Sequence, residues 1–407
     1  MLRFNIKKKF MLNNILIIGG SSRKDYLEPF DKLKGKINMF FLTHYSPKEK
    51  TITKEYGEEI FWSSFSSGFE LLKTLQIKKI IFYEFESYND IALRVAAIHL
   101  KIICCHLEHG YQDYSNEYFI RQNNSPLLFK TKIHEIPFLS YIKLYFKNRF
   151  YYETYLKSNY DLKKQLLMFY KLRSRYHIEN KEKFENLKLS LLKLDFYISF
   201  SSENFKFVKI LHHLGNDFKD YKFIGFPNSD YAFKLKKTTK FNTNKLLFID
   251  QPFFEYNLYG WTRRYKSFFL KDLKSLAEKK GLDLVIKPHP SNDMDIYKNM
   301  GYKMAYDNIF NNYSYVIGFN SAILFPISAI PNMLLFCLNN HPKPFKNIEN
   351  NVFVKGKVAI GLNQLSEFSK DLLERKILEK DRKIFIKKYM YKFDGKSKDR
   401  LTKIILS

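Results

Sequence analysis

Short apolar runs alternate with helical stretches along most of this 407-residue chain, and this alternation restricts the fold more than any other feature. In the first half, the apolar runs lie at residues 15–18, 37–42, 79–83 and 102–106. Strands that alternate with helices in this way form βαβ units around a mainly parallel sheet. The sequence therefore predicts an α/β protein.

A chain of this length exceeds the usual limit of one hydrophobic core, so we expect two domains. A Pro-Asn-Ser turn after residue 226 and the polar run that follows it form the best linker, since four further strand-like runs begin at residue 245. We predict a first domain over residues 1–235, with a helical insertion near 140–193, and a second domain over residues 236–407.

The formal net charge of +28 raises the question of a nucleic-acid partner. The Lys and Arg residues are dispersed rather than gathered in one arm, so we expect no nucleic acid and favour other anionic partners, among them phospholipid and acidic sugars. Three cysteines without metal-ligand spacing fit a reducing cytoplasm, and no segment approaches the ~20 apolar residues that span a bilayer. The expected location is cytoplasmic, with peripheral association at the inner face of the plasma membrane left open. Whether Met1 or Met11 is the natural start, and the oligomeric state, are also left open.

The most informative segment is the apolar run 284–286, which leads into Lys287-Pro288-His289-Pro290. Asn292 and Asp293 can then cap a helix, so a cation and an imidazole would lie beside a helix N-terminus, where phosphate binds readily. Two interpretations of His289 are open. It is either a turn histidine satisfied by the backbone or a rigid donor to a leaving phosphate.

A second turn of this kind follows the strand-like run 313–317, in Gly318-Phe319-Asn320-Ser321. Asn320 and Ser321 can cap a helix, bind an anion, or do both, because the two tasks use the same groups. Gln251 follows a third strand and adds a weaker signal. Two such turns in consecutive strand–loop–helix units predict a site for an activated nucleotide donor.

In the first domain, the strand 102–106 leads into Glu108-His109-Gly110. A carboxylate at the carboxyl end of a parallel strand lies where such sheets bind ligands, and burial would give Glu108 the raised pKa of a general base. The alternative is that Glu108 caps a turn and that His109 is a surface residue. We read Asp293 and Asp295 as first-turn helix charges rather than metal ligands.

Taken in order, these motifs resemble those of the bacterial sialyltransferases and polysialyltransferases of glycosyltransferase family 52 and related capsule or lipooligosaccharide enzymes. Members of that group carry an acidic–acidic–Gly motif, a His-Pro motif and a Ser/Thr motif. The matching positions here are Glu108-His109-Gly110, His289-Pro290 and Asn320-Ser321, with His109 in place of the second acidic residue. Similar His-Pro motifs occur in Kdo transferases and in CDP-glycerol glycerophosphotransferases, which also use cytidine nucleotides.

The resemblance implies a GT-B fold, with two Rossmann-like domains facing each other across a cleft and a C-terminal helix returning to the first domain. It also implies an inverting, metal-independent transfer of a nonulosonic acid, such as sialic acid, from a CMP-activated co-substrate to a glycan or glycolipid hydroxyl, with no other cofactor. Glu108 would be the base and His289 would assist the departure of CMP. The implied donor-binding residues are Lys287, Pro290, Gln251, Gly318, Asn320 and Ser321. The alternatives are a CMP-Kdo transferase, a CDP-glycerol glycerophosphotransferase, and a non-enzymatic basic protein that binds glycan or nucleic acid.

Overall fold

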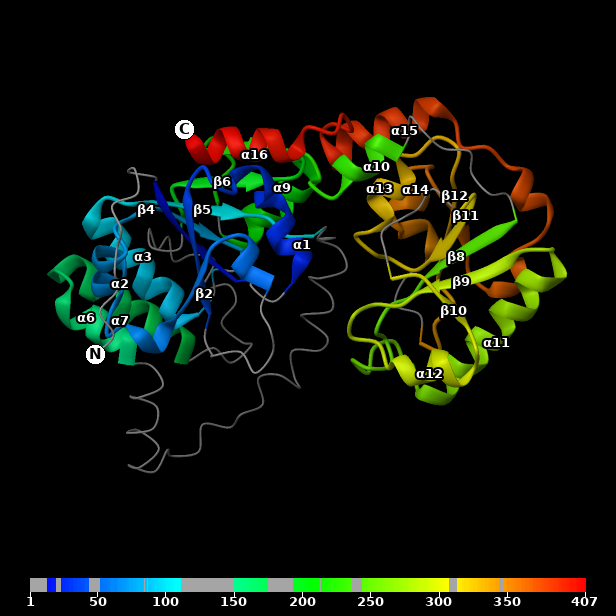
Figure 1. Cartoon of the computed structure of the whole chain (residues 1–407), viewed down its shortest axis with the longest axis horizontal. Coiled ribbons are helices and arrows are strands. Elements are labelled where there is room, and N and C mark those ends of the chain that lie inside the picture. The colour runs from blue at the N-terminus through cyan, green and yellow to red at the C-terminus, as the bar shows by residue number, and fades with distance from the viewer. Residues whose placement is uncertain are drawn as a thin grey trace. The chain divides into compact units, whose positions relative to one another are not determined.

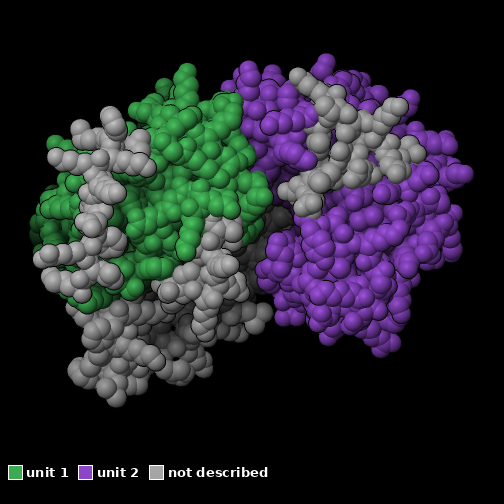
Figure 2. Space-filling view, viewed as in Figure 1, with its two compact units in different colours: residues 1–224, 398–407 green, residues 225–397 purple. Residues whose placement is uncertain are grey.

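The computed structural model divides into two compact units, residues 1–224 with 398–407, and residues 225–397 (Figure 2). It describes residues 13–19, 23–43, 52–83, 85, 87–110, 149–174, 193–212, 214–235, 244–306, 313–343 and 347–407. Both candidate start residues, Met1 and Met11, lie outside this range, as do residues 140–148 and 175–192 of the expected helical insertion.

The first unit contains a seven-stranded sheet in the order β3-β2-β1-β4-β5-β6-β7, and all of its strand pairs are parallel (Figure 1). The strands are β1 (Asn14–Ile18), β2 (Asn38–Thr43), β3 (Glu58–Phe61), β4 (Ile77–Phe82), β5 (Ile103–Leu107), β6 (Phe196–Ser199) and β7 (Tyr221–Phe223). Their order is that of a Rossmann sheet, in which the connections reverse direction between the first and fourth strands.

Helices cover this sheet through apolar side chains. The described helices of the first unit are α1 (Lys24–Leu27), α2 (Gly68–Thr74), α3 (Tyr88–Leu100), α6 (Arg149–Lys157), α7 (Tyr160–Ser174), α9 (Ser202–Leu211) and α16 (Ser397–Leu406), which begins at the unit boundary. Tyr151 of α6 and Leu166 of α7 are buried in the same core as the α3 residues 91–97. The described part of the predicted helical insertion thus contains α6 and α7, which belong to the first unit.

Helix α16 returns to the first unit, as predicted. Its Lys398 and Asp399 pair with Asp31 and Lys32, and Arg400 donates to the Ile224 carbonyl over 2.6 Å. The Lys79 Nζ atom of β4 reaches the Ile405 carbonyl at 2.8 Å. The last ten residues are thus part of a unit whose other residues all precede position 225.

The second unit contains a six-stranded parallel sheet in the order β10-β9-β8-β11-β12-β13. Its strands are β8 (Lys245–Ile249), β9 (Asp283–Lys287), β10 (Lys303–Met304), β11 (Tyr315–Gly318), β12 (Leu334–Leu338) and β13 (Ile360–Leu362). The helices of this unit are α10 (Ser229–Leu235), α11 (Arg263–Lys279), α12 (Met294–Asn299), α13 (Leu324–Ser328), α14 (Val352–Lys355) and α15 (Glu379–Phe385). The strand order again reverses after the first strand, here between β8 and β11.

The units meet in sequence between Ile224 and Gly225, whereas the sequence analysis drew the boundary after residue 235. The segment between these positions contains α10, which packs on α13 of the second unit, and Phe226 stacks against Phe325 of that unit. The Pro-Asn-Ser turn therefore opens the second unit.

Strands β3, β10 and β13 were not predicted from the sequence. Each lies at the edge of its sheet and is only two to four residues long. An edge strand needs only one hydrogen-bonded neighbour, and short edge strands carry little hydrophobic periodicity. The central strands, which are buried on both faces, were the ones that the apolar runs revealed.

Candidate functional site

Three neighbouring strands of the second sheet end at the same level. Ile249 of β8 lies opposite Lys287 of β9 on one side and opposite Gly318 of β11 on the other. The segments that follow these strands, with Gln251, His289 and Asn320, therefore leave the same edge of the sheet at the point where the strand order reverses. Ligands of doubly wound sheets bind at this position.

The loop that carries His289 is held in a defined conformation. The Ser291 backbone N–H donates to the His289 Nδ1 atom over 3.1 Å, and the His289 N–H donates to the Asn292 side-chain oxygen. An Nδ1 atom that accepts a hydrogen bond has no proton of its own, so a neutral imidazole carries its proton on Nε2. In that state the ring can act as an Nε2–H donor, and a backbone N–H holds its Nδ1 atom.

The other predicted residues on this loop and on β8 are less constrained. The Lys287 Nζ atom donates to the Tyr306 carbonyl over 3.2 Å, and Pro290 is exposed. Gln251 is half-buried, and its side-chain amide donates to the Asp250 carbonyl over 3.2 Å. A bound anion can compete for Lys287 and Gln251, because each donates a hydrogen bond to a neutral backbone carbonyl.

Gly318 has a structural explanation. A Cβ atom at this position would lie 3.2 Å from both the Cβ and the carbonyl oxygen of Ile249, so the close approach of β8 and β11 favours glycine. Asn320 and Ser321 are half-buried in the turn that follows, where the Ser321 carbonyl accepts from the Leu324 N–H. Helix α13 has five residues and α12 six, whereas the sequence pattern predicts helices over residues 321–329 and 293–300.

A buried ionic cluster lies next to the His289 loop. The Lys266 Nζ atom of α11 is 3.2 Å from an Asp250 carboxylate oxygen and 3.0 Å from Glu255 Oε1. Asp250 also accepts a hydrogen bond from the Tyr297 hydroxyl of α12. Burial acts to raise the pKa of Glu255, but the Asp293 backbone N–H and Lys266 outweigh it and hold that pKa below its usual value. Glu255 is therefore ionised at neutral pH.

The sequence analysis missed Lys266, although the sequence carries a signal for it. The buried face of α11 is formed by Lys266, Phe269, Leu270, Leu273 and Ala277. These positions follow the spacing of an amphipathic helix, and a lysine on the apolar face of such a helix requires a buried partner. Asp250 at the end of β8 is that partner.

Glu108 lies in the first unit, directly after β5, and its side chain is buried. Its Oε2 atom accepts hydrogen bonds from the Ser199 hydroxyl at 2.6 Å and from the Phe200 N–H at 2.8 Å. Among the described residues, Oε1 has no hydrogen bond of normal geometry, although the nearby Asn204 side chain acts on the carboxylate. Burial raises the pKa of Glu108 to about 7, against the opposing effect of Ser199, Phe200 and Asn204. Glu108 therefore bonds to Ser199, the last residue of β6, and to Phe200, which follows it.

His109 is engaged with α1. Its ring stacks on Tyr26 with centroids 3.4 Å apart, and its Nε2 atom is 3.3 Å from an Asp25 carboxylate oxygen. Burial acts to raise the pKa of Asp25, but hydrogen bonds from His109 and Arg23 lower it to about 2. His109 is thus held by two residues of α1 in the same unit.

Asp293 is the N-cap of α12, since its side chain accepts from the Asp295 N–H, and it pairs with Arg263 at 3.1 Å. This is the capping role that the sequence suggested. Within the described residues, no group of three or more His, Cys, Asp or Glu side chains is placed to hold a metal ion.

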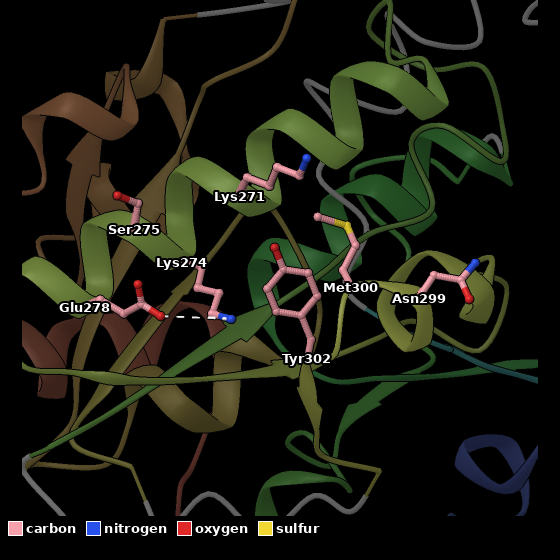
Figure 3. A pocket seen from close by; sticks show the side chains of 7 residues that line it. All are labelled: Lys271, Lys274, Ser275, Glu278, Asn299, Met300 and Tyr302. Atoms are coloured by element: carbon pink, nitrogen blue, oxygen red, sulfur yellow. Dashed lines mark ion pairs between the residues drawn. The ribbon is translucent and has the colours of Figure 1, made fainter.

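A surface hollow of about 500 Å³ lies elsewhere on the second unit, between α11, α12 and the start of β10 (Figure 3). Its lining residues are Lys271, Lys274, Ser275, Glu278, Asn299, Met300 and Tyr302. None of the predicted site residues lines it. Lys274 of this hollow pairs with Glu278 on the same helix at 4.0 Å.

No protein-family model and no curated protein sequence matches this chain. Among solved structures it is similar to the wall teichoic acid polymerase TagF, with a TM-score of 0.51 and 11% identity over 97% of this chain and 87% of that one. It is also similar to the calicheamicin glycosyltransferase CalG4, with a TM-score of 0.52 and 8% identity over 97% of this chain and 98% of that one. The fold is GT-B. At these identities the likeness establishes the fold, and it confirms the predicted pair of Rossmann-like domains.

No helix within the described part of the GT-B chain is both long and apolar enough to cross a bilayer.

Proposed function

We propose that this protein is an inverting glycosyltransferase that moves a nonulosonic acid from a CMP-activated donor to a hydroxyl of a surface glycan or glycolipid. One observation carries the proposal. The ends of β9, β8 and β11 are level, so the segments with His289, Gln251 and Asn320-Ser321 share one edge of the second sheet at its reversal point. The family resemblance of the same motifs supports the choice of a cytidine nucleotide.

The donor phosphate is bound by this edge of the second unit. Lys287 contributes a positive charge, and the His289 Nε2–H donates to a phosphate oxygen as the bond between that oxygen and the anomeric carbon breaks. The Ser291-to-Nδ1 hydrogen bond supports this role, because it fixes the proton on Nε2. Donors placed before the reaction stabilise developing negative charge most effectively.

In the first unit, Glu108 takes the proton of the acceptor hydroxyl as that oxygen forms its bond to the anomeric carbon. The proton then resides on Glu108, and CMP leaves with the electron pair of the broken bond. A pKa of about 7 supports this role, since a general base works best when its pKa is close to the working pH.

A second candidate is a CDP-glycerol glycerophosphotransferase. The observation that favours it is the similarity to TagF, whose solved structure is a histidine variant soaked with CDPG. Both candidates place a cytidine nucleotide at the same edge of the second unit. They differ in the group that is transferred.

Thermal-shift titration with CMP-sialic acid, CMP-Kdo, CDP-glycerol and UDP-glucose tests the proposal. A donor that binds only the folded state raises the melting temperature in proportion to its occupancy. We expect CMP-sialic acid to stabilise the chain and to release CMP when a glycan acceptor is added. Stabilisation by CDP-glycerol alone would establish the second candidate, and stabilisation by UDP-glucose alone would reject both.

A further inference from the structure

Two consecutive residues, Glu255 and Tyr256, form hydrogen bonds to the loop that carries His289. Glu255 Oε1 accepts hydrogen bonds from the Asn292 side-chain amide at 3.2 Å and from the Asp293 N–H at 2.8 Å. The Tyr256 hydroxyl donates to the Ser291 hydroxyl over 2.9 Å. Every residue from Ser291 to Asp293 therefore bonds to this pair.

These contacts reach the imidazole through two routes. Ser291, which Tyr256 holds, donates its backbone N–H to His289 Nδ1. Asn292, which Glu255 holds, accepts the His289 backbone N–H. One route sets the ring and its tautomer, and the other sets the backbone from which the ring projects.

The pair is itself anchored in the interior. Lys266 is almost fully buried and joins Glu255 to Asp250, which in turn accepts from Tyr297 of α12. The cluster contains two carboxylates and one ammonium group, and the ionised Glu255 also accepts hydrogen bonds from neutral donors. Two of these neutral donors, the Asn292 amide and the Asp293 N–H, come from the His289 loop. Charge-assisted hydrogen bonds of this kind are stronger than neutral ones. The Glu255 carboxylate therefore holds the loop close to Lys266 of α11.

We infer that Glu255 and Tyr256, anchored by Lys266, act as positioning residues that fix the orientation and the Nε2–H tautomer of His289. Only the use of that N–H on a donor phosphate rests on the proposed function. The restriction of the ring is a property of the chain alone, and it can be measured without any substrate.

Nitrogen NMR of the full chain with ¹⁵N-labelled histidine measures it directly. At pH 8, above the ordinary imidazole pKa of about 6.5, a fixed ring gives one protonated and one unprotonated nitrogen, whereas a released ring averages two tautomers. His289→Ala assigns the signals. We expect the wild type to be Nε2-protonated, and both Tyr256→Phe and Glu255→Gln to shift the two nitrogens toward a common average.

Tyr231→Phe is the matched control, because Tyr231 is another exposed tyrosine of the second unit, in α10. It should leave the His289 signals unchanged. If both variants, Tyr256→Phe and Glu255→Gln, fold and give the same His289 nitrogen signals as the wild type, the inference is wrong. If Glu255→Gln fails to fold, Tyr256→Phe decides, since it removes one hydroxyl from an exposed side chain.

Kinetics separate this inference from the proposed function. With a donor that the wild type turns over, Tyr256→Phe should lower kcat roughly tenfold and change the donor KM less than about threefold, as expected when an interaction acts mainly in the transition state. If no cytidine donor is turned over but the nitrogen signals still respond to Tyr256→Phe, the positioning role stands and the proposed function falls. Unchanged kcat in Tyr256→Phe, with averaged nitrogen signals, would show that ring orientation does not limit transfer and would remove the link to catalysis.

Discussion

Single residues in the two units are prepared for proton chemistry in different ways. His289 is half-buried and held by hydrogen bonds within its own loop, which set its tautomer. Glu108 is buried, and removal from water raises the pKa of its carboxyl group. The hydrogen bonds of His289 determine which ring nitrogen carries a proton, and the burial of Glu108 determines how readily its carboxylate accepts one.

His289→Ala should fold normally and lose transfer by about a hundredfold or more, the range for a lost acid or charge-stabilising donor. Folding should persist because the ring is only half-buried, and the Asn292 bond is made by the His289 backbone. Steady-state release of CMP from CMP-sialic acid measures the loss. Turnover within a few-fold of the wild type would contradict the assigned role.

Glu108→Gln should keep its affinity for CMP while transfer to the acceptor falls by about two orders of magnitude, as for a lost general base. The affinity should persist because Glu108 belongs to the first unit and the donor residues to the second. Titration calorimetry with CMP, beside a transfer assay, checks both parts. Weak CMP binding with residual transfer would instead assign Glu108 to the donor.

Transfer should survive excess EDTA. Asp293 caps α12 and pairs with Arg263, so its carboxylate is already engaged, and Asp295, only two residues further on, is not at a spacing that faces it. Charge on the departing phosphate is instead offset by Lys287 and His289. Activity that disappears in EDTA and returns with stoichiometric Mn²⁺ would reject this mechanism.

At the scale of secondary-structure elements, β5 and the residue after it carry two buried titratable groups with opposite effects on stability. Burial raises the pKa of Glu108 to about 7, and it lowers the pKa of His106 to about 4 despite a backbone hydrogen bond at Tyr83. A raised carboxyl pKa favours the folded state at low pH, and the benefit is lost as pH rises from about 4.5 to about 7. A depressed imidazole pKa favours the folded state above about 6.5, and the benefit is lost as pH falls toward about 4.

Urea denaturation at pH 5 and pH 8 can isolate the Glu108 contribution. The free energy of unfolding of the wild type, relative to Glu108→Gln, should fall by about 2 to 3 kcal/mol between these pH values, from the linkage of about 1.4 kcal/mol per pKa unit. His106→Gln should show the reverse trend against the wild type. A difference between wild type and Glu108→Gln that does not change with pH would mean that Glu108 titrates alike in both states.

The sequence predicted the elements that obey simple periodicity. The central strands of both sheets, and helices α3 and α11, follow from apolar spacing alone. The short edge strands and the lengths of α12 and α13 did not, because they depend on one neighbour or on turn geometry. Pro326, near the start of α13, is one example, since it cannot donate a backbone hydrogen bond.

Part of the candidate site could not be predicted from the sequence either. The Lys-Pro-His-Pro turn and Glu108 were visible because they follow apolar strands. The Asp25 partner of His109 and the Glu255 partner of Lys266 were not, since each contact joins segments that meet only in the folded unit. An ion pair between residues that are separated along the chain leaves no periodic pattern in the amino-acid sequence.

For the whole molecule, the return of α16 makes the first unit discontinuous in sequence. Deletion of residues 398–407 would remove the buried side chains of Leu401 and Ile405 and the ion pairs of Lys398 and Asp399. Burial of two such side chains contributes about 3 to 6 kcal/mol. We expect the first unit of the truncated chain to unfold at a clearly lower temperature.

Hydrogen exchange followed by mass spectrometry can assign the effect to a unit. Peptides from β1, β4 and β7 should lose protection in the truncated chain, while those from β8 and β11 should not, because they belong to the other unit. Equal loss of protection in both units would mean that the chain unfolds as one cooperative body.

The position of α16 also determines when the first unit can be completed during synthesis. A ribosome builds this chain from the N-terminus, so all seven strands of the first sheet emerge before residue 225, yet the helix that joins this unit is made only after the second unit. Domains generally fold as units while the chain is still being made. The first unit is therefore incomplete until the whole second unit has been translated. Until then, the apolar surface that Leu401 and Ile405 later cover stays exposed. A stop codon between the second unit and α16 would therefore leave the apolar surface under Leu401 and Ile405 uncovered.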